Sequence, residues 1–94
     1  MPAYVIGHIH VRDADRWQDY VTQVGATSAA FGGEVLLRGE TVKVFSGEHR
    51  FERVVVLRFL DQDAVARWHS SLEYQRLIAG RDQAADVTLI SYNA

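Results

Sequence analysis

The chain contains no cysteine, and only one proline and one methionine among its 94 residues. It therefore has no disulfides, no thiolate metal ligands and no cysteine nucleophile, a composition that fits a cytosolic protein. No apolar run approaches the ~20 residues of a membrane span, and the start shows no signal-peptide pattern. A net charge of −2 argues against nucleic-acid binding. We therefore expect a cytoplasmic protein with neither nucleic acid nor membrane as partner.

Several common site motifs are also missing. The sequence has no P-loop, no GxGxxG, no GxSxG and no HExxH pattern, which disfavours nucleotide binding and serine-hydrolase chemistry. What remains is an ordinary globular composition, 48% hydrophobic and 23% charged. Its length predicts a single domain over residues 1–94.

The segment Arg53–Phe59 is the strongest predicted strand, because four β-branched or aromatic residues lie within it. Alternate residues of a strand point to opposite faces, and both faces of this one are mostly apolar. A chain this short can cover one face with its own helices. The other face then needs a partner subunit or a ligand.

Other segments complete the pattern. Strands are expected at 4–11, 34–38 and 87–92, with 41–45 extended and a turn or bulge at Gly39–Glu40. A helix capped by Asp13 or Asp15 carries an apolar stripe and ends at Gly32–Gly33. A second helix begins at Asp61, and a third at a capping box with Ser70 at the cap. The order β-α-β-β-α-β predicts an α+β, ferredoxin-like split βαβ fold: an antiparallel sheet with helices on one face.

Several local strings, spread over essentially the whole chain, resemble one bacterial family. They are Ala3-Tyr4-Val5-Ile6, Tyr20, Phe31-Gly32-Gly33, Leu37-Arg38-Gly39, Arg53-Val54-Val55-Val56 with Phe59, Trp68-His69-Ser70, Glu73-Tyr74-Gln75 and Arg81. The family is domain of unknown function 1330 (DUF1330), within the dimeric α+β barrel superfamily. The chain departs from the family pattern at Glu40, at Leu60-Asp61, at His69 and at Leu72.

The resemblance implies a homodimer, in which two four-stranded sheets pack face to face with the helices outside. Ligand pockets in this superfamily lie between sheet and helices or near the dimer edge. Its members include cofactor-free monooxygenases, haem-dependent enzymes, lactone isomerases and ligand-binding modules. Fold likeness alone does not choose among these activities.

Two histidines, His8 and His10, lie two residues apart on one predicted strand and so share a face. They form either one side of a metal site completed by a third ligand such as His69 or Asp13, or a general base, or a pair of hydrogen-bonded and exposed residues. No ligand spacing in the sequence fixes a metal site, so none is predicted.

Around the third helix, an imidazole, a phenol and an indole could converge at one pocket mouth. His69 follows Trp68 at the helix break, and Tyr74 starts the next helix. Together they could hold an aromatic or enol-like substrate and move a proton. Equally, Trp68 and Tyr74 could be core aromatics and His69 solvent-facing.

Anion-binding candidates are three arginines, with Tyr20 as a possible hydrogen-bond donor. Arg58 lies on an apolar strand face and needs a carboxylate or an anionic ligand nearby, or reaches solvent. Arg38 ends a strand and Arg81 lies one turn past an apolar helix face, so either could bind a carboxylate or pair with a neighbouring acid. Tyr20 could equally be a packing residue.

These features support two hypotheses. The first is a small-molecule ligand-binding module without catalysis. The second is a cofactor-independent enzyme acting on a small aromatic or enolisable substrate, with His8 or His69 as base, Tyr74 as donor and Arg38 or Arg58 holding an anion. No cofactor is expected, and haem binding is the least favoured alternative because no histidine is clearly aimed at a pocket from a helix face. The enzyme hypothesis requires a histidine, a tyrosine and an arginine in one pocket.

Overall fold

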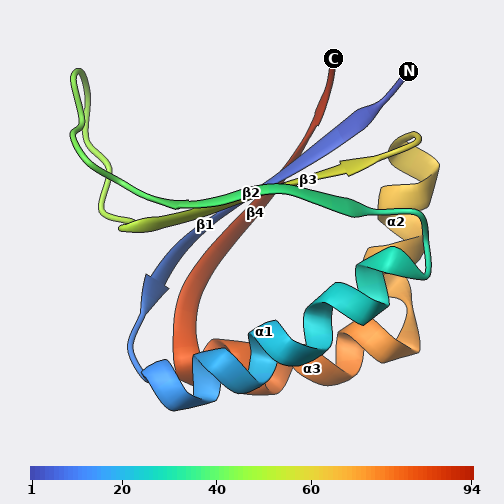
Figure 1. Ribbon diagram of the computed structural model, residues 1–94, viewed down its shortest axis with the longest axis horizontal. Coiled ribbons are helices and arrows are strands. Elements are labelled where there is room, and N and C mark those ends of the chain that lie inside the picture. The colour runs from blue at the N-terminus through green and yellow to red at the C-terminus, as the bar shows by residue number, and fades with distance from the viewer.

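The computed structural model describes residues 1–94 as a sheet with helices packed on one of its faces. The strands are β1 (Ala3–Val11), β2 (Glu34–Glu40), β3 (Arg53–Phe59) and β4 (Ala85–Asn93). The helices are α1 (Ala14–Ala29), α2 (Gln62–Ser70) and α3 (Leu72–Ala84). Figure 1 shows all three helices on the same side of the sheet. None of these three helices has the length and apolar character that a membrane-spanning helix needs.

The strands form one antiparallel sheet in the order β2-β3-β1-β4. β3 lies between β1 and β2, and β1 lies between β3 and β4, so each helical connection crosses over one strand. This is the split βαβ arrangement predicted from the order of elements. The predicted α+β, ferredoxin-like fold is confirmed.

The core lies between the helices and one face of the sheet. Alternate residues of β1 and β3 point into it, as the period-two pattern requires. Phe59 is 1% exposed, and its ring lies 5.4 Å from that of Trp68, which in turn lies 4.4 Å from that of Tyr74. Burying a side chain such as Phe59 contributes roughly 1.5–3 kcal/mol. These three rings attach the α2–α3 pair to the sheet.

The ends of α1 are those that the sequence predicts. Asp13 caps the first turn, where its carboxylate accepts a hydrogen bond from the Arg16 N–H at 3.2 Å. At the other end Gly32 has φ +76°, and the N–H groups of Gly32 and Gly33 donate to the carbonyls of Ala29 and Ser28. This is a Schellman motif, which places glycine at the left-handed position.

The boundary between α2 and α3 differs from the prediction by one residue. Asp61 caps α2 as expected, accepting from the Ala64 N–H at 2.9 Å. The cap of α3, however, is Ser71, whose hydroxyl oxygen accepts from the Tyr74 N–H at 3.2 Å. Ser70 remains in α2 and donates to the carbonyl of Ala66. Adjacent serines offer the same capping group, and the extended backbone of Ser71, with ψ 147°, decides which one is used.

The prediction of a turn or bulge at Gly39–Glu40 is wrong. Both residues remain paired with β3, and β2 continues through them. The irregularity lies earlier, between Val35 and Leu37, where Leu36 is the extra residue. A bulge on this edge strand costs little, because the strand has no partner on its other side.

Residues 41–52 form a long connection between β2 and β3, here called the arm. Figure 1 shows it extending beyond the end of the sheet, on the side away from the helices. Its base is closed by hydrogen bonds from the N–H and hydroxyl of Thr41 to the carbonyls of Glu52 and Phe51. Val42 and Phe45 are 97% and 87% exposed. The segment 41–45, predicted to be extended, forms no strand.

The face of the sheet opposite the helices, here called the open face, carries no helix (Figure 1), and His49 and Phe51 of the arm lie against it, at His8. Apolar and aromatic residues dominate its centre: Tyr4, Ile6, His8, Val54, Val56, Ile90 and Tyr92. All of them are partly or largely exposed. The two-sided apolar character predicted for Arg53–Phe59 thus corresponds to one buried face and one uncovered face.

Candidate ligand-binding site

A cleft lies between α1 and the helix-covered face of the sheet. Its volume is about 460 Å³, including the part open to solvent, and it is a narrow gap between side chains. Ten of its fourteen lining residues are hydrophobic, and they come from both sheet and helices. None of the fourteen is an aspartate, a glutamate or a histidine. The cleft therefore fits a mainly apolar ligand better than a metal ion or a polar one.

Two glycines shape the cleft. Gly25, on α1, faces the cleft, and a Cβ built on it would meet no atom within 4 Å. Gly7, on β1, lies beneath the side chains of Val55 and Leu89, which a Cβ would approach to 2.9 and 3.1 Å. Gly25 thus leaves room at the wall of the cleft. Gly7 lets neighbouring side chains lie across its floor.

Arg38 lines the cleft because of the bulge in β2. Val35 pairs with Leu57 and Arg38 pairs with Val55, so both belong to the helix-covered face although they are three residues apart. In a regular strand, residues at this odd spacing would point to opposite faces. The bulge adds one residue between them and so re-aims Arg38 toward α1.

A second arginine lies beside Arg38. Arg38 and Arg53 both line a hollow of about 490 Å³ that also shares Ile9 and Trp17 with the cleft, so the two spaces are continuous. Neither guanidinium belongs to any of the ion pairs of the chain. Two unpaired cations at the mouth of an apolar cleft create a place for an anionic group.

Tyr20 lies on the wall of the cleft formed by α1 and is part of a hydrogen-bonded chain. Its ring stacks on that of Trp17 at 5.0 Å, and its hydroxyl lies 3.0 Å from the hydroxyl of Tyr74. Arg81 donates from Nη1 to the Tyr74 oxygen at 2.9 Å. Burial, followed by the adjacent Tyr74, raises the pKa of Tyr20 above that of an ordinary phenol. Tyr20 is therefore a donor, not a base, at neutral pH.

Tyr74 and Arg81 lie behind the cleft and do not line it. Tyr74 is fully buried, and its hydroxyl is enclosed between α1 and α3. Burial alone would lower the pKa of Arg81, but its contacts with Tyr74 and Asp82 raise it. Arg81 therefore supplies a fixed positive charge behind the two phenols.

The predicted trio of His69, Trp68 and Tyr74 does pack together, but not around a pocket. The His69 ring lies 5.5 Å from that of Tyr74 and 6.3 Å from that of Trp68, on the exposed side of α2. Trp68 is buried in the core, and its indole N–H donates to the hydroxyl of Thr27 at 3.1 Å. Of the three, only Trp68 lines the cleft.

His8 lies on the open face, away from the cleft. Its ring centroid is 5.0 Å from that of His49 and 6.1 Å from that of Phe51, both at the end of the arm. Its Nδ1 is buried and has no hydrogen-bond partner within the chain. No group of three or more histidine, aspartate or glutamate side chains is placed to hold a metal ion.

His10 and Arg58 also lie on the open face, and each faces an acid. His10 contacts Glu52 at 2.9 Å; burial alone would raise the pKa of Glu52, but hydrogen bonds from the Val11 N–H and from His10 lower it. Arg58 lies 3.9 Å from Glu34, and about half of its side chain is exposed.

Of the predicted site residues, the structure thus brings Arg38 and Tyr20 together in the cleft, with Tyr74 and Arg81 behind them. It leaves His8, Arg58 and His69 outside. Sequence reasoning missed Arg53 and Gly25. Arg53 shares its strand face with Val55 and Leu57, and Gly25 interrupts a predicted helix, so each could have been found from those patterns.

Comparison with solved structures shows the same fold in proteins of low sequence identity. The RPA0582 protein of unknown function from Rhodopseudomonas palustris matches with a TM-score of 0.84 at 17% identity, over 99% of this chain and 82% of that one. A dimeric ferredoxin-like protein of unknown function from Jannaschia sp. CCS1 gives 0.80 at 12% identity, over the full length of both chains. SnoaB, a cofactor-independent oxygenase from Streptomyces nogalater, gives 0.74 at 11% identity, over 99% and 92%.

No match was found among curated proteins. A family model, however, matches nearly the whole chain, over residues 2–93. It confirms the resemblance noted from the local strings of the sequence. The chain belongs to the family described as Domain of unknown function (DUF1330).

Proposed function

We propose that this protein binds a small organic molecule in the cleft between α1 and the sheet. The ligand has an apolar, ring-sized body and an anionic oxygen group such as a carboxylate. The observation that carries the proposal is the unpaired Arg38 at the mouth of an otherwise apolar cleft. Arg38 is exposed and makes no ion pair within the chain, so its guanidinium is free to bind an anionic group.

The lining of the cleft supports this proposal. Small-molecule sites usually have mostly apolar walls and a few polar groups that orient the ligand. Here the polar residues are Arg38 at the mouth and Tyr20 and Ser28 on α1. Arg53, in the adjoining hollow, adds a second positive charge for the anionic end.

We further propose that two copies of the chain associate through their open faces. The open face exposes Ile90 and Tyr92 at 38% and 45%, next to the partly buried Ile6 and Val56. The Jannaschia protein, which has a similar fold, is described as dimeric. Pairing of two such sheets removes the apolar surface from water while the cleft, on the other face, stays accessible.

The second candidate is a cofactor-independent enzyme. It is favoured by the polarised Tyr20–Tyr74–Arg81 chain and by the fold that SnoaB shares. It lacks a base, however, because neither His8 nor His69 lines the cleft and no carboxylate does. The binding function is therefore the better supported of the two.

Blocking the cleft tests the proposal. A thermal-shift screen would use aromatic carboxylates, phenols and quinones on the unaltered protein, Gly25→Leu and Ala79→Leu. A ligand at ten times its Kd stabilises by about 1.4 kcal/mol, which raises the Tm of a domain this size by roughly 5–10 °C. Gly25→Leu fills the cleft and should abolish the shift. Ala79→Leu is the control, since Ala79 is exposed on α3 and lines neither the cleft nor the groove between α1 and α3.

Equal shifts in the unaltered protein and Gly25→Leu would mean that the ligands bind elsewhere, against the proposal. An absence of any shift across the three ligand classes would also count against it. Arg38→Met tests whether Arg38 binds the anionic group of the ligand while the apolar walls bind its body. It should weaken carboxylates about tenfold or more while leaving uncharged quinones nearly unaffected, because only the charged ligand loses a partner.

A further inference from the structure

The hydrogen-bonded chain behind the cleft has a direction, which Arg81 fixes at one end. A guanidinium has donors only and is never an acceptor. In the 2.9 Å contact between Arg81 Nη1 and the Tyr74 hydroxyl, the tyrosine oxygen is therefore the acceptor. The proton of Tyr74 remains available for a second contact.

Burial decides which acceptor receives the hydroxyl proton of Tyr74. Tyr74 is 0% exposed, so water does not reach its hydroxyl. The Tyr20 oxygen, at 3.0 Å, is the one acceptor that the hydroxyl meets. If Tyr20 donated instead, the Tyr74 proton would stay unbonded inside the core, which proteins avoid. Tyr74 thus donates to Tyr20.

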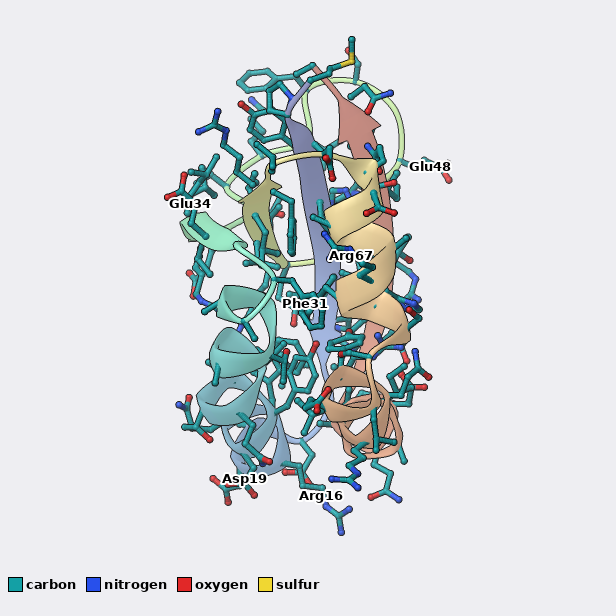
Figure 2. All side chains as sticks on the ribbon, turned by 90° about the vertical axis from the view of Figure 1, so that its right-hand side faces the viewer. Arg16, Asp19, Phe31, Glu34, Glu48 and Arg67 are labelled. Carbon is teal, nitrogen blue, oxygen red and sulfur yellow. The ribbon has the colours of Figure 1, made fainter.

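This direction leaves the proton of Tyr20 free. Tyr20 has no acceptor for its own proton among its neighbours, since Tyr74 donates to it and Arg81, which also acts on its hydroxyl, has donors only. It is the one residue that lines both the cleft and an outer polar groove between α1 and α3. Figure 2 shows two further residues of that groove, Arg16 and Asp19, pointing to solvent at the N-terminal end of α1. The residues of this groove and those of the hollow beside Arg38 do not overlap. Tyr20 therefore lies where the cleft adjoins the groove, and Arg38 lies where the cleft adjoins the hollow.

We infer that Tyr20 is the terminal donor of the relay Arg81→Tyr74→Tyr20, and that it donates to a carbonyl oxygen of the ligand in the cleft. The inference rests on the proposed function and specifies its ligand: an apolar keto-carboxylate, with the carboxylate at Arg38 and the ketone at Tyr20. Tyr74 and Arg81 are positioning residues that orient and polarise the Tyr20 hydroxyl. The raised pKa of Tyr20 keeps that proton in place across the neutral range.

The test compares two naphthalene probes of the same shape. 6-Acetyl-2-naphthoate carries a carboxylate and a ketone, and 6-isopropenyl-2-naphthoate replaces the ketone oxygen by a CH₂ group. Calorimetric titration of the unaltered protein should show the acetyl probe binding about fivefold to tenfold more tightly, as one neutral hydrogen bond predicts. This comparison needs no variant.

Variants then assign the preference to the relay. Tyr20→Phe should bring the ratio of the two affinities to about one without weakening the isopropenyl probe. Tyr74→Phe should lower the ratio part of the way, because the Tyr20 hydroxyl is no longer held. Ser70→Ala, which removes an exposed hydroxyl on α2 away from both the cleft and the open face, is the control and should keep the full ratio. A merely structural role would lower both affinities together and leave the ratio unchanged.

The possible failures are distinct. Measurable but equal binding of both probes by the unaltered protein overturns the relay inference and leaves the proposed binding function standing. A ratio that persists in Tyr20→Phe also overturns it. If neither probe binds at about 1 mM, the proposed site fails and the inference fails with it.

Discussion

Gly33 lies where no larger residue fits, directly against the ring of Phe59. A Cβ at this position would come within 2.6 Å of two ring atoms and within 3.0 Å of the Ser28 carbonyl oxygen. Phe59 is held between the sheet and Trp68, so its ring cannot move aside without disturbing the core. Gly33 therefore has a packing role in addition to its place in the Schellman motif.

Gly33→Ala is accordingly expected to destabilise the protein by about 1–3 kcal/mol, the usual cost of forcing an extra methyl group into a packed core. Urea unfolding, followed by circular dichroism, would measure it. Gly80→Ala is the control, because its Cβ meets nothing within 4 Å on an exposed helix face, and it should stabilise by about 0.5–1 kcal/mol. Equal effects of the two substitutions would show that the contact with Phe59 does not restrict Gly33.

At the scale of elements, α1 combines a structural role with the formation of the cleft. Trp17, Val24 and Ser28 bury one stripe of the helix, and Tyr20 and Gly25 leave the neighbouring stripe open to the cleft. A glycine inside a helix is unfavourable relative to alanine. Its presence here is explained by the space that it keeps free.

Gly25→Ala should therefore stabilise the protein by about 0.5–1 kcal/mol while reducing the room for a ligand. The stability gain would appear in urea unfolding, and the loss of room as weaker binding of any ligand that the thermal-shift screen identifies. Gly80→Ala again provides the comparison, because it should give a similar gain in stability without weakening binding. Destabilisation by Gly25→Ala would contradict the open space at this position.

The elements themselves were largely predictable from local patterns. The caps at Asp13 and Asp61 and the stop at Gly32 act within one turn of the chain, so the sequence contains what is needed to place them. The choice of Ser71 over Ser70 depends on a single backbone angle. The bulge near Leu36 depends on pairing with β3, which is a tertiary contact.

The site was less predictable, because its residues come from several elements and belong to it only if their side chains point to the helix-covered face of the sheet. Both faces of β3 are apolar, so the sequence does not say which face the helices cover, and hence whether His8 joins the pocket. Arg38 reaches the cleft only through the bulge, which reverses the expected alternation. Tyr20, on the predicted helical stripe, was recognisable as a possible donor, but its link to Tyr74 and Arg81 requires the packing of α1 against α3.

At the scale of the whole molecule, the uncovered sheet face is the feature that a second copy would complete. Light scattering on the purified protein is expected to give twice the chain mass of 10.6 kDa. Val56→Glu places a charge at the centre of the open face and should yield a folded monomer, because desolvating an unpaired carboxylate opposes association. Leu57→Glu is the control on the opposite face; Leu57 is 6% exposed beneath the helices, so this substitution should unfold the chain. A stable monomer of the unaltered protein, or a dimer that Val56→Glu leaves intact, would show that the open face is not where the copies meet.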